Sequence, residues 1–171
     1  LFLFALVLVL LCALSPEAKA ATSGTCGENL TWTLEDGTLT ISGTGPMEDY
    51  VAMWATPWAD IRGNIKKIVI EDGVTGLGDY AFCYYDNLRS VTIPDSVTSI
   101  GRSAFANCSS LVSITIPGGV TSINDYAFYY CADLKTITVP ASVTRIGVAA
   151  FLDAGLTSAV IEGTSKWMAN K

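Results

Sequence analysis

The side chains that most often carry out catalysis or hold metal ions are scarce in this sequence. Histidine is absent, and it is the commonest general base and the commonest nitrogen ligand of metals. Ser-His and Cys-His catalysis and histidine-containing zinc sites are therefore excluded. Carboxylates are present, but they occur in stretches such as "LEDGT", "IEDGV" and "IPDSV", where an aspartate side chain supports a tight turn. Without a nucleophile and base pair or a glycine-rich phosphate loop, we expect a non-catalytic protein that uses no cofactor and no metal.

Cysteine is the remaining residue type with reactive chemistry. Beyond residue 20 the chain has Cys26, Cys83, Cys108 and Cys131. No C-x-x-C spacing joins them, which argues against a metal site. Cys108 and Cys131 occupy the same position of a repeat described below, so we expect them on adjacent coils. Two interpretations remain: a column of buried apolar thiols, which we favour, and a Cys108–Cys131 disulfide, which an exported chain would permit.

The first 20 residues have the pattern of a signal peptide. Residues 1–14, "LFLFALVLVLLCAL", are apolar and uncharged, but the run is shorter than a membrane-spanning helix. Ala18 and Ala20 then form an A-x-A cleavage pattern, which predicts a mature chain that starts at Ala21. Because the sequence begins with Leu and has no basic segment before the apolar run, we expect its true N-terminus to be missing. The protein is therefore predicted to be extracellular or bound to the cell surface.

The charge of the chain argues against two classes of partner. Its net charge is −6, and removal of the signal peptide takes away one acid, Glu17, and one base, Lys19, so this value does not change. A moderately acidic chain without basic clusters lacks the positive surface that binds nucleic acid or anionic lipid. We expect neither nucleic-acid binding nor membrane insertion after the signal peptide is removed.

Most of the remaining chain is an internal repeat. Three units of 23 residues and one of 22 align on their first apolar residue, and a fifth is incomplete. The units span residues 65–87, 88–110, 111–133, 134–155 and 156–164. One such unit is too small to bury its own apolar face, whereas stacked units bury a continuous core. The repeat therefore predicts a β-rich solenoid of parallel short strands and short helical turns, over residues 65–164.

Each position of the repeat has a structural role, as the second unit, "LRSVTIPDSVTSIGRSAFANCSS", illustrates. The alternating apolar residues of "LRSVTI" predict a short strand with one buried face. Pro94 ends this strand because proline has no N–H to donate. The stretch "VTSI" predicts a second extended segment, and the pair Ala104 and Phe105 is expected on a short helical turn that fills the interior.

The combined pattern "L-x-x-I-x-I-P-x-x-V-T-x-I-x-x-x-A-F-x-x-C" closely resembles the bacterial surface-antigen (BspA-like) type of leucine-rich repeat. The resemblance covers about residues 65–164. It implies a bacterial surface protein whose repeats attach to host matrix proteins, host cells or other bacteria. The first unit departs from the pattern at Glu71 and Tyr85, which replace proline and cysteine, and the fourth unit has Ala154 at the cysteine position.

Residues 21–64 precede the repeats and predict a β-hairpin cap. Leu30, Trp32 and Leu34 alternate with threonines, "EDG" follows, and Leu39 and Ile41 alternate with polar residues again. This is the pattern of a hairpin with a glycine-containing turn. The stretch after it is rich in aromatic residues, which we interpret as part of a cap over the first coil, with an aromatic sugar-binding site as the alternative. Residues 165–171 form a tail that we expect to be truncated.

Two groups of side chains are candidates for binding a partner. The outward strand positions form a polar strip, the Ser/Thr strip, with the candidate residues Ser90, Thr92, Ser113, Thr115, Thr136 and Thr138. These hydroxyl side chains also simply suit a strand, so the strip has a purely structural interpretation as well. The second group is a tyrosine cluster with the candidates Tyr84, Tyr85, Tyr129 and Tyr130. Tyrosine is enriched at interfaces, but some of these rings are expected to pack in the core.

These features predict a secreted or cell-surface module that mediates protein–protein or cell-adhesion binding without catalysis. The expected partner is an extracellular protein or glycan on host or neighbouring cells. The alternative is a structural spacer whose repeats belong to a larger surface protein or enzyme.

Overall fold

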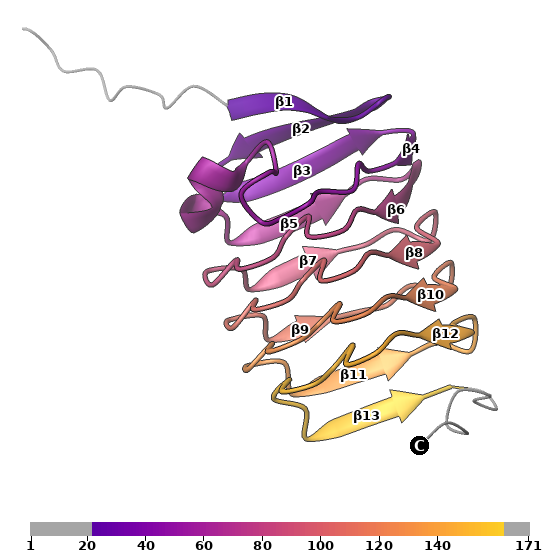
Figure 1. Ribbon diagram of the computed structural model, residues 1–171. Coiled ribbons are helices and arrows are strands. Elements are labelled where there is room, and N and C mark those ends of the chain that lie inside the picture. The colour runs from indigo at the N-terminus through magenta and orange to yellow at the C-terminus, as the bar shows by residue number, and fades with distance from the viewer. Residues whose placement is uncertain (1–21, 163–171) are drawn as a thin grey trace, which may run out of the picture.

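The computed structural model describes residues 22–162, which wind into a stack of coils below an N-terminal cap (Figure 1). The first sheet has the order β1 (Thr22–Gly27), β2 (Leu30–Glu35), β3 (Thr38–Gly43), β5 (Lys67–Ile70), β7 (Ser90–Thr92) and β9 (Ser113–Ile114). The second sheet has the order β12 (Arg145–Ile146), β10 (Ser122–Ile123), β8 (Ser99–Ile100), β6 (Val74–Leu77) and β4 (Gly45–Pro46). A further parallel pair joins β11 (Thr136–Val139) to β13 (Ser158–Ile161). The helical content of residues 22–162 is one 3-10 helix, η1 (Ala59–Asn64).

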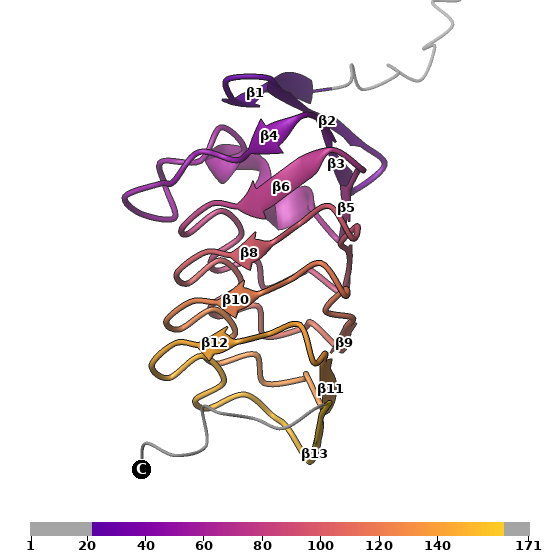
Figure 2. The same cartoon turned by 90° about the vertical axis from the view of Figure 1, so that its right-hand side faces the viewer.

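The spatial period of the stack is the length of the sequence repeat. In the first sheet Ser90 pairs with Ser113, and in the second sheet Ser99 pairs with Ser122, both in parallel register. Hydrogen bonds from the threonine of the Val-Thr pair, such as Thr98 Oγ1 to the Thr75 carbonyl oxygen, also join residues 23 positions apart. Figure 2 shows the second-sheet strands one above another, with the turns that follow them gathered on one side. The predicted β-solenoid is confirmed.

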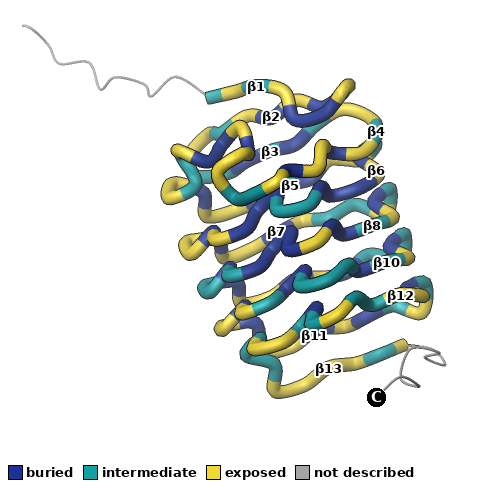
Figure 3. Tube along the Cα trace, viewed as in Figure 1, coloured by how far each residue is buried: buried dark blue, intermediate teal, exposed yellow. Residues whose placement is uncertain are grey.

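The interior consists of columns of identical or similar side chains. The leucine and isoleucine columns of successive coils are buried, and the tube in Figure 3 shows buried positions recurring at the same place in each coil. The phenylalanine column forms a continuous stack with ring centroids 5.3, 5.5 and 5.4 Å apart from Phe82 through Phe105 and Phe128 to Phe151. Burial of this column across coils supplies the core that a single 23-residue unit lacks.

The segments that carry the Ala-Phe pair are turns, not the short helical turns expected from the sequence. Tyr80 and Tyr84 have positive φ angles of 57° and 64°, which a right-handed helix cannot contain. The N–H groups of Ala81 and Cys83 bond within the coil, to residues three positions earlier, whereas that of Phe82 bonds to the next coil. This alternation leaves every second N–H free to link one coil to the next, which a helix would prevent.

The cap contains the predicted hairpin and one strand more. Asp36 and Gly37, with φ of 46° and 77°, form the two-residue turn between β2 and β3, as expected for a type I′ turn. Strand β1, which the sequence pattern did not predict, pairs antiparallel with β2. On its other side β3 pairs in parallel with β5, so the cap continues the first sheet directly. Trp58 then joins the aromatic stack, because its ring lies nearly parallel to that of Phe82 at 5.7 Å and its Nε1 donates to the Ala81 carbonyl oxygen at 3.0 Å.

Candidate interaction surfaces

The cysteines beyond residue 21 are buried free thiols. Cys108 Sγ donates to the Phe82 carbonyl oxygen at 3.1 Å, and Cys131 Sγ donates to the Phe105 carbonyl oxygen at 3.2 Å. The structure therefore contains the column of buried thiols, and Cys108 and Cys131 do not form the disulfide that was the alternative interpretation. Desolvation by burial raises the pKa of Cys131 to about 12 and that of Cys83 to about 11, so the thiols stay protonated and are poor nucleophiles at neutral pH.

Several aspartates have a structural role in linking the coils. Asp79 Oδ1 accepts from the Arg102 N–H at 2.6 Å, and Asp125 Oδ1 accepts from the Val148 N–H at 2.8 Å. In the cap, Asp49 Oδ1 accepts from the N–H of Asp79 at 2.9 Å. Each carboxylate therefore satisfies a backbone donor of the following coil. Of the aspartates that the sequence assigned to turns, Asp95 makes a contact of the same kind, because its Oδ1 accepts from the Gly118 N–H of the next coil at 3.1 Å.

Residues 22–162 contain neither a metal-binding cluster nor a membrane-spanning helix. In this part of the chain no set of three or more His, Cys, Asp or Glu side chains is placed to share a metal ion. Nor does any helix there have the length and hydrophobicity needed to cross a bilayer. The predicted signal peptide, residues 1–20, and the tail, residues 165–171, lie outside the described residues.

The Ser/Thr strip lies on the outer face of the first sheet and continues onto the β11–β13 pair. All six of its candidate residues, Ser90, Thr92, Ser113, Thr115, Thr136 and Thr138, are exposed. The cap extends the strip, because Thr31 and Thr33 on β2 are also exposed and Thr33 pairs with Thr40 on β3. Hydroxyl side chains thus occupy these positions on most strands, but β5, between the cap and β7, has Lys67 and Val69 there, and β13 has Val160 opposite Thr138.

The tyrosine candidates divide between the surface and the core. Tyr84 and Tyr130 are 45% and 50% exposed, and Tyr129 is half-buried with its ring centroid 6.0 Å from that of Tyr126. Tyr85 is fully buried, so its selection as a binding residue was wrong. Tyr85 occupies the position of Cys108 and Cys131, which point to the interior in their own coils. Burial raises the pKa of its hydroxyl, which the neighbouring Thr56 hydroxyl partly offsets, and the ring packs edge-on against Phe82.

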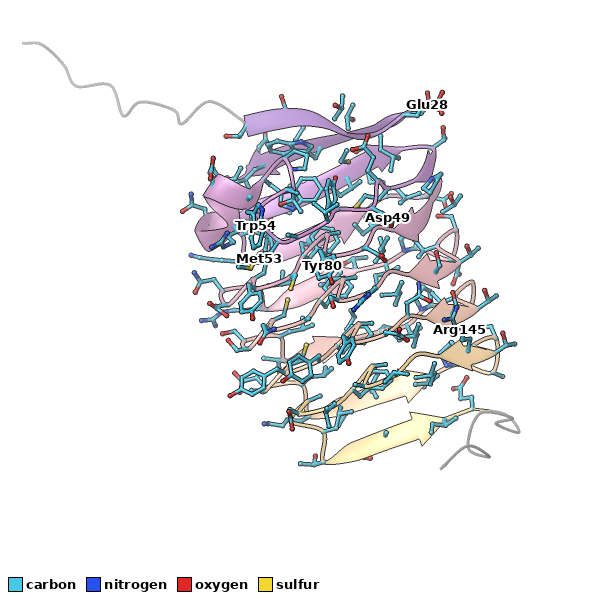
Figure 4. The ribbon with its side chains drawn as sticks, in the orientation of Figure 1. Glu28, Asp49, Met53, Trp54, Tyr80 and Arg145 are labelled. Atoms are coloured by element: carbon cyan, nitrogen blue, oxygen red, sulfur yellow. The ribbon has the colours of Figure 1, made fainter. Side chains whose placement is uncertain are left out.

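Exposed apolar side chains gather on the side of the solenoid formed by the turns. We define the turn face as the exposed side chains of the loop from β4 to η1 and of the turns after β6, β8, β10 and β12. Its large apolar members are Val51, Trp54, Tyr84, Tyr130, Val148 and Leu152. Figure 4 shows Met53 and Trp54 on the loop beside η1, with Tyr80 on the coil below. The loop is held to this coil because the Tyr50 N–H donates to the Asp79 carbonyl oxygen at 3.0 Å.

Val51 and Trp54 are the most exposed members of the turn face, with 87% and 71% of their surface exposed. Sequence reasoning assigned Trp54 to the cap and did not select Val148 or Leu152. A signal was present in the fourth repeat, where Val148 replaces the linking aspartates found at the same position in the first and third repeats. Arg102 adds a cation, with its guanidinium carbon 6.0 Å from the centre of the Tyr126 ring. Aromatic residues and arginine are the residue types that interfaces favour.

Comparisons with known proteins agree with this architecture. A family model described as "BspA type Leucine rich repeat region (6 copies)" matches residues 61–170. The chain belongs to the BspA-type leucine-rich-repeat family. It is similar to the crystal structure of a leucine-rich repeat protein from Eubacterium ventriosum, with a TM-score of 0.70 and 30% identity over 84% of this chain and 45% of that one.

Two other solved structures extend the comparison. A leucine rich cell surface protein from Faecalibacterium prausnitzii has a TM-score of 0.66 and 27% identity over 81% of this chain and 39% of its own. A leucine-rich repeat protein from Bacteroides capillosus has a TM-score of 0.56 and 31% identity over 82% of this chain and 99% of its own. The present chain thus spans less than half the length of the Eubacterium and Faecalibacterium proteins. None of the curated proteins matches the sequence.

Proposed function

We propose that this BspA-type chain is a non-catalytic binding module, exported to the cell surface, that attaches to extracellular proteins or glycans through its turn face. The observation that carries the proposal is the collection of exposed apolar and aromatic side chains on that face. Large apolar and aromatic side chains such as Trp54 and Tyr130 are residue types that contribute strongly to interfaces when they are exposed. A surface location is supported by the similarity to the Faecalibacterium protein, which is described as a cell surface protein.

The turn face is a better candidate for binding than the Ser/Thr strip. Aromatic side chains such as Trp54 and Tyr130 bury a large area with few rotatable bonds, and they dominate the binding energy of many interfaces. The strip offers mainly hydroxyl groups that exchange one hydrogen bond with water for one with a partner, so each contributes little net free energy. The lack of an unusual chemical group on the strip also fits its role as an ordinary strand surface.

The rival function, a spacer for other domains, is separated from binding by a direct assay. Purified protein would be immobilised and tested by surface plasmon resonance against a panel of extracellular matrix proteins and glycans. We expect saturable binding that weakens about tenfold or more in the double variant Tyr130→Ser and Leu152→Ser. The matched control replaces Thr92, Thr115 and Thr138 with Glu and should leave this affinity within about twofold of the parent value.

Each alternative has its own result in this assay. Loss of binding in the triple glutamate variant alone would assign the interaction to the Ser/Thr strip. Absence of saturable binding across the whole panel would favour the spacer. Circular dichroism of both variants, compared with the parent protein, separates loss of a contact from loss of the fold.

A further inference from the structure

A pocket lies at the joint between the cap and the first coil, at one end of the turn face. It has a volume of about 420 Å³ and is lined by Ala59, Asp60, Arg62, Gly63, Tyr84, Asp86 and Asn87. One wall comes from η1 and the other from the turn after β6. The volume falls in the range of about 300 to 1,000 Å³ that small-molecule sites occupy.

The two walls are fixed to each other by a hydrogen bond. Asn87 Nδ2 donates to the Gly63 carbonyl oxygen at 2.8 Å, which ties the coil turn to the end of η1. On the coil side, Ser109 of the next coil donates to Asp86 Oδ1 at 3.4 Å. On the cap side, Arg62 donates through one nitrogen to the Ala59 carbonyl oxygen at 3.4 Å. The pocket is therefore already formed without a ligand, which reduces the cost of ordering on binding.

The residues of this pocket differ from those at the same positions of the next coil. Tyr84, Asp86 and Asn87 of the first coil correspond to Asn107, Ser109 and Ser110 of the second. The first coil thus has an aromatic ring, a carboxylate and an amide where the second has smaller polar groups. Only the first coil lies beside η1, the one helix of residues 22–162. The coil that has the larger side chains is therefore also the coil that forms the pocket.

We propose that this pocket binds a neutral pyranose sugar, with the Tyr84 ring against its C–H face and the planar polar side chains of Arg62, Asp86 and Asn87 bonded to its hydroxyl groups. A sugar hydroxyl both donates and accepts, and the pocket supplies both kinds of partner. Carboxylates accept, a guanidinium donates through five N–H groups, and an amide does both. Carboxylate and guanidinium groups also present two atoms side by side, which suits adjacent hydroxyls on a ring.

The charges of the pocket argue against ligands with a single charge. The two carboxylates of Asp60 and Asp86 and the one guanidinium of Arg62 give the pocket a net negative charge, which disfavours an anion such as phosphate. For a lone cation the attraction of the exposed carboxylates is screened and is opposed by Arg62. A zwitterion such as an amino acid has both charges, but Asp60 and Asp86 are exposed, so water and salt weaken their attraction for an ammonium group. Hydrogen bonding and stacking by Tyr84, which is 45% exposed, remain effective under these conditions. They favour a neutral polyhydroxylated ring.

The inference rests on the proposed function in one respect, that the chain binds extracellular ligands, and it names a ligand class for one end of the turn face. The structure offers a matched pair of variants for testing it. Tyr84 and Tyr130 have the same position in their repeats, similar exposure, and φ angles of 64° and 55°. Asn107 holds this position in the second coil with a φ of 59°, and asparagine tolerates this conformation well. Tyr84→Asn and Tyr130→Asn should therefore both fold.

The experiment uses methyl α-D-mannopyranoside and methyl β-D-galactopyranoside as neutral probes, N-acetylneuraminic acid as an anionic sugar and glycine as a zwitterion. Binding to the purified protein would be measured by saturation-transfer NMR and by titration of protein amide shifts. We expect at least one neutral glycoside to bind with a Kd of about 1 mM. Tyr84→Asn should weaken this binding about tenfold or more, as should Arg62→Gln, while Tyr130→Asn should change it by less than about twofold.

Other outcomes would overturn the pocket assignment. They are no binding of either glycoside up to about 50 mM, stronger binding of glycine or N-acetylneuraminic acid that Tyr84→Asn abolishes, or equal effects of the two asparagine variants. The matrix-protein assay on the same variants separates this failure from failure of the proposed function. If Tyr130→Asn weakens binding of a matrix protein while no sugar binds, the pocket inference fails and the binding module stands.

Discussion

Phe105→Ala tests whether the stacked phenylalanine column holds the solenoid together. Phe105 is fully buried and lies between two nearly parallel rings, with centroid distances of 5.3 Å to Phe82 and 5.5 Å to Phe128. Removing its ring leaves a cavity that these neighbours cannot close, because each is held in turn by the next ring of the stack. Phenylalanine-to-alanine changes in cores cost about 3 to 5 kcal/mol, and the two-sided stack places this site toward the upper end.

The expected loss is large compared with the stability of a typical domain. Native domains are stable by about 5 to 15 kcal/mol, so the variant loses a substantial part of its margin. For a chain of this length, about 2 to 4 °C of melting temperature corresponds to each kcal/mol. We therefore expect the melting temperature of Phe105→Ala to fall by about 6 to 20 °C.

Phe151→Ala is the matched control in the same column. Phe151 is half-buried, and among the described residues its ring stacks on Phe128 alone, at 5.4 Å. Its removal should cost clearly less. Both variants would be unfolded with heat and with urea and followed by circular dichroism, with the slope of the urea transition checked against the parent protein. A melting temperature within about 2 °C of the parent for Phe105→Ala, or equal losses in both variants, would refute the column as the source of stability.

Two further predictions concern the thiols and the spacing of the coils. Burial raises the pKa of Cys26 to about 12, from 9.0, and that of Cys83 to about 11. The unfolded chain therefore ionises its thiols first as the pH rises, and stability that is complete below about pH 9 should decline between about pH 9 and 12. Urea midpoints measured from about pH 7 to 10.5 test this expectation, and a midpoint that does not change with pH would contradict it. The variant Cys83→Ala, which has the residue found at the same position of the next coil, Ala106, should show a smaller decline. Gly101→Ala should destabilise the fold by about 1 to 3 kcal/mol, because its Cβ would lie 2.6 Å from the Leu77 carbonyl oxygen. Gly118→Ala, whose Cβ meets nothing nearer than an Asp95 oxygen at 3.9 Å, is the control, and equal melting temperatures would show that coil spacing at Gly101 is adjustable.

The coil architecture was predictable because each buried position repeats. A single apolar residue is ambiguous, but the same residue type at every 23rd position indicates a column. The hairpin was predictable for a local reason, since Asp36 and Gly37 suit the positive φ angles of a type I′ turn. Strand β1 has no such local signal. Its sequence, "TSGTCG", contains a single buried side chain, the small Cys26, and its strand conformation depends on pairing with β2.

The candidate site was predictable only in part. Tyr84 and Tyr85 are identical neighbours in the sequence, yet one is exposed and the other fully buried. The positive φ of Tyr84 sets its direction, and this depends on the turn rather than on the side chain. The alignment of Tyr85 with Cys108 held the necessary information, because both belong to an inward column. The pocket had no such signal, since it depends on where η1 meets the first coil.

The two surfaces of the solenoid differ in what a partner could recognise. Along the Ser/Thr strip, β7, β9 and β11 present nearly the same short hydroxyl side chains, so a partner shifted by one coil within this part would meet almost the same surface. Along the turn face, one position carries Tyr84, Asn107, Tyr130 and Asp153 in successive coils. A partner shifted by one coil would there place an aromatic contact against an amide or a carboxylate, and it would lose most of that contact's binding energy. The turn face is therefore better suited to recognition at a defined register, because side chains there do not have to satisfy the pairing and packing that make the strand positions alike.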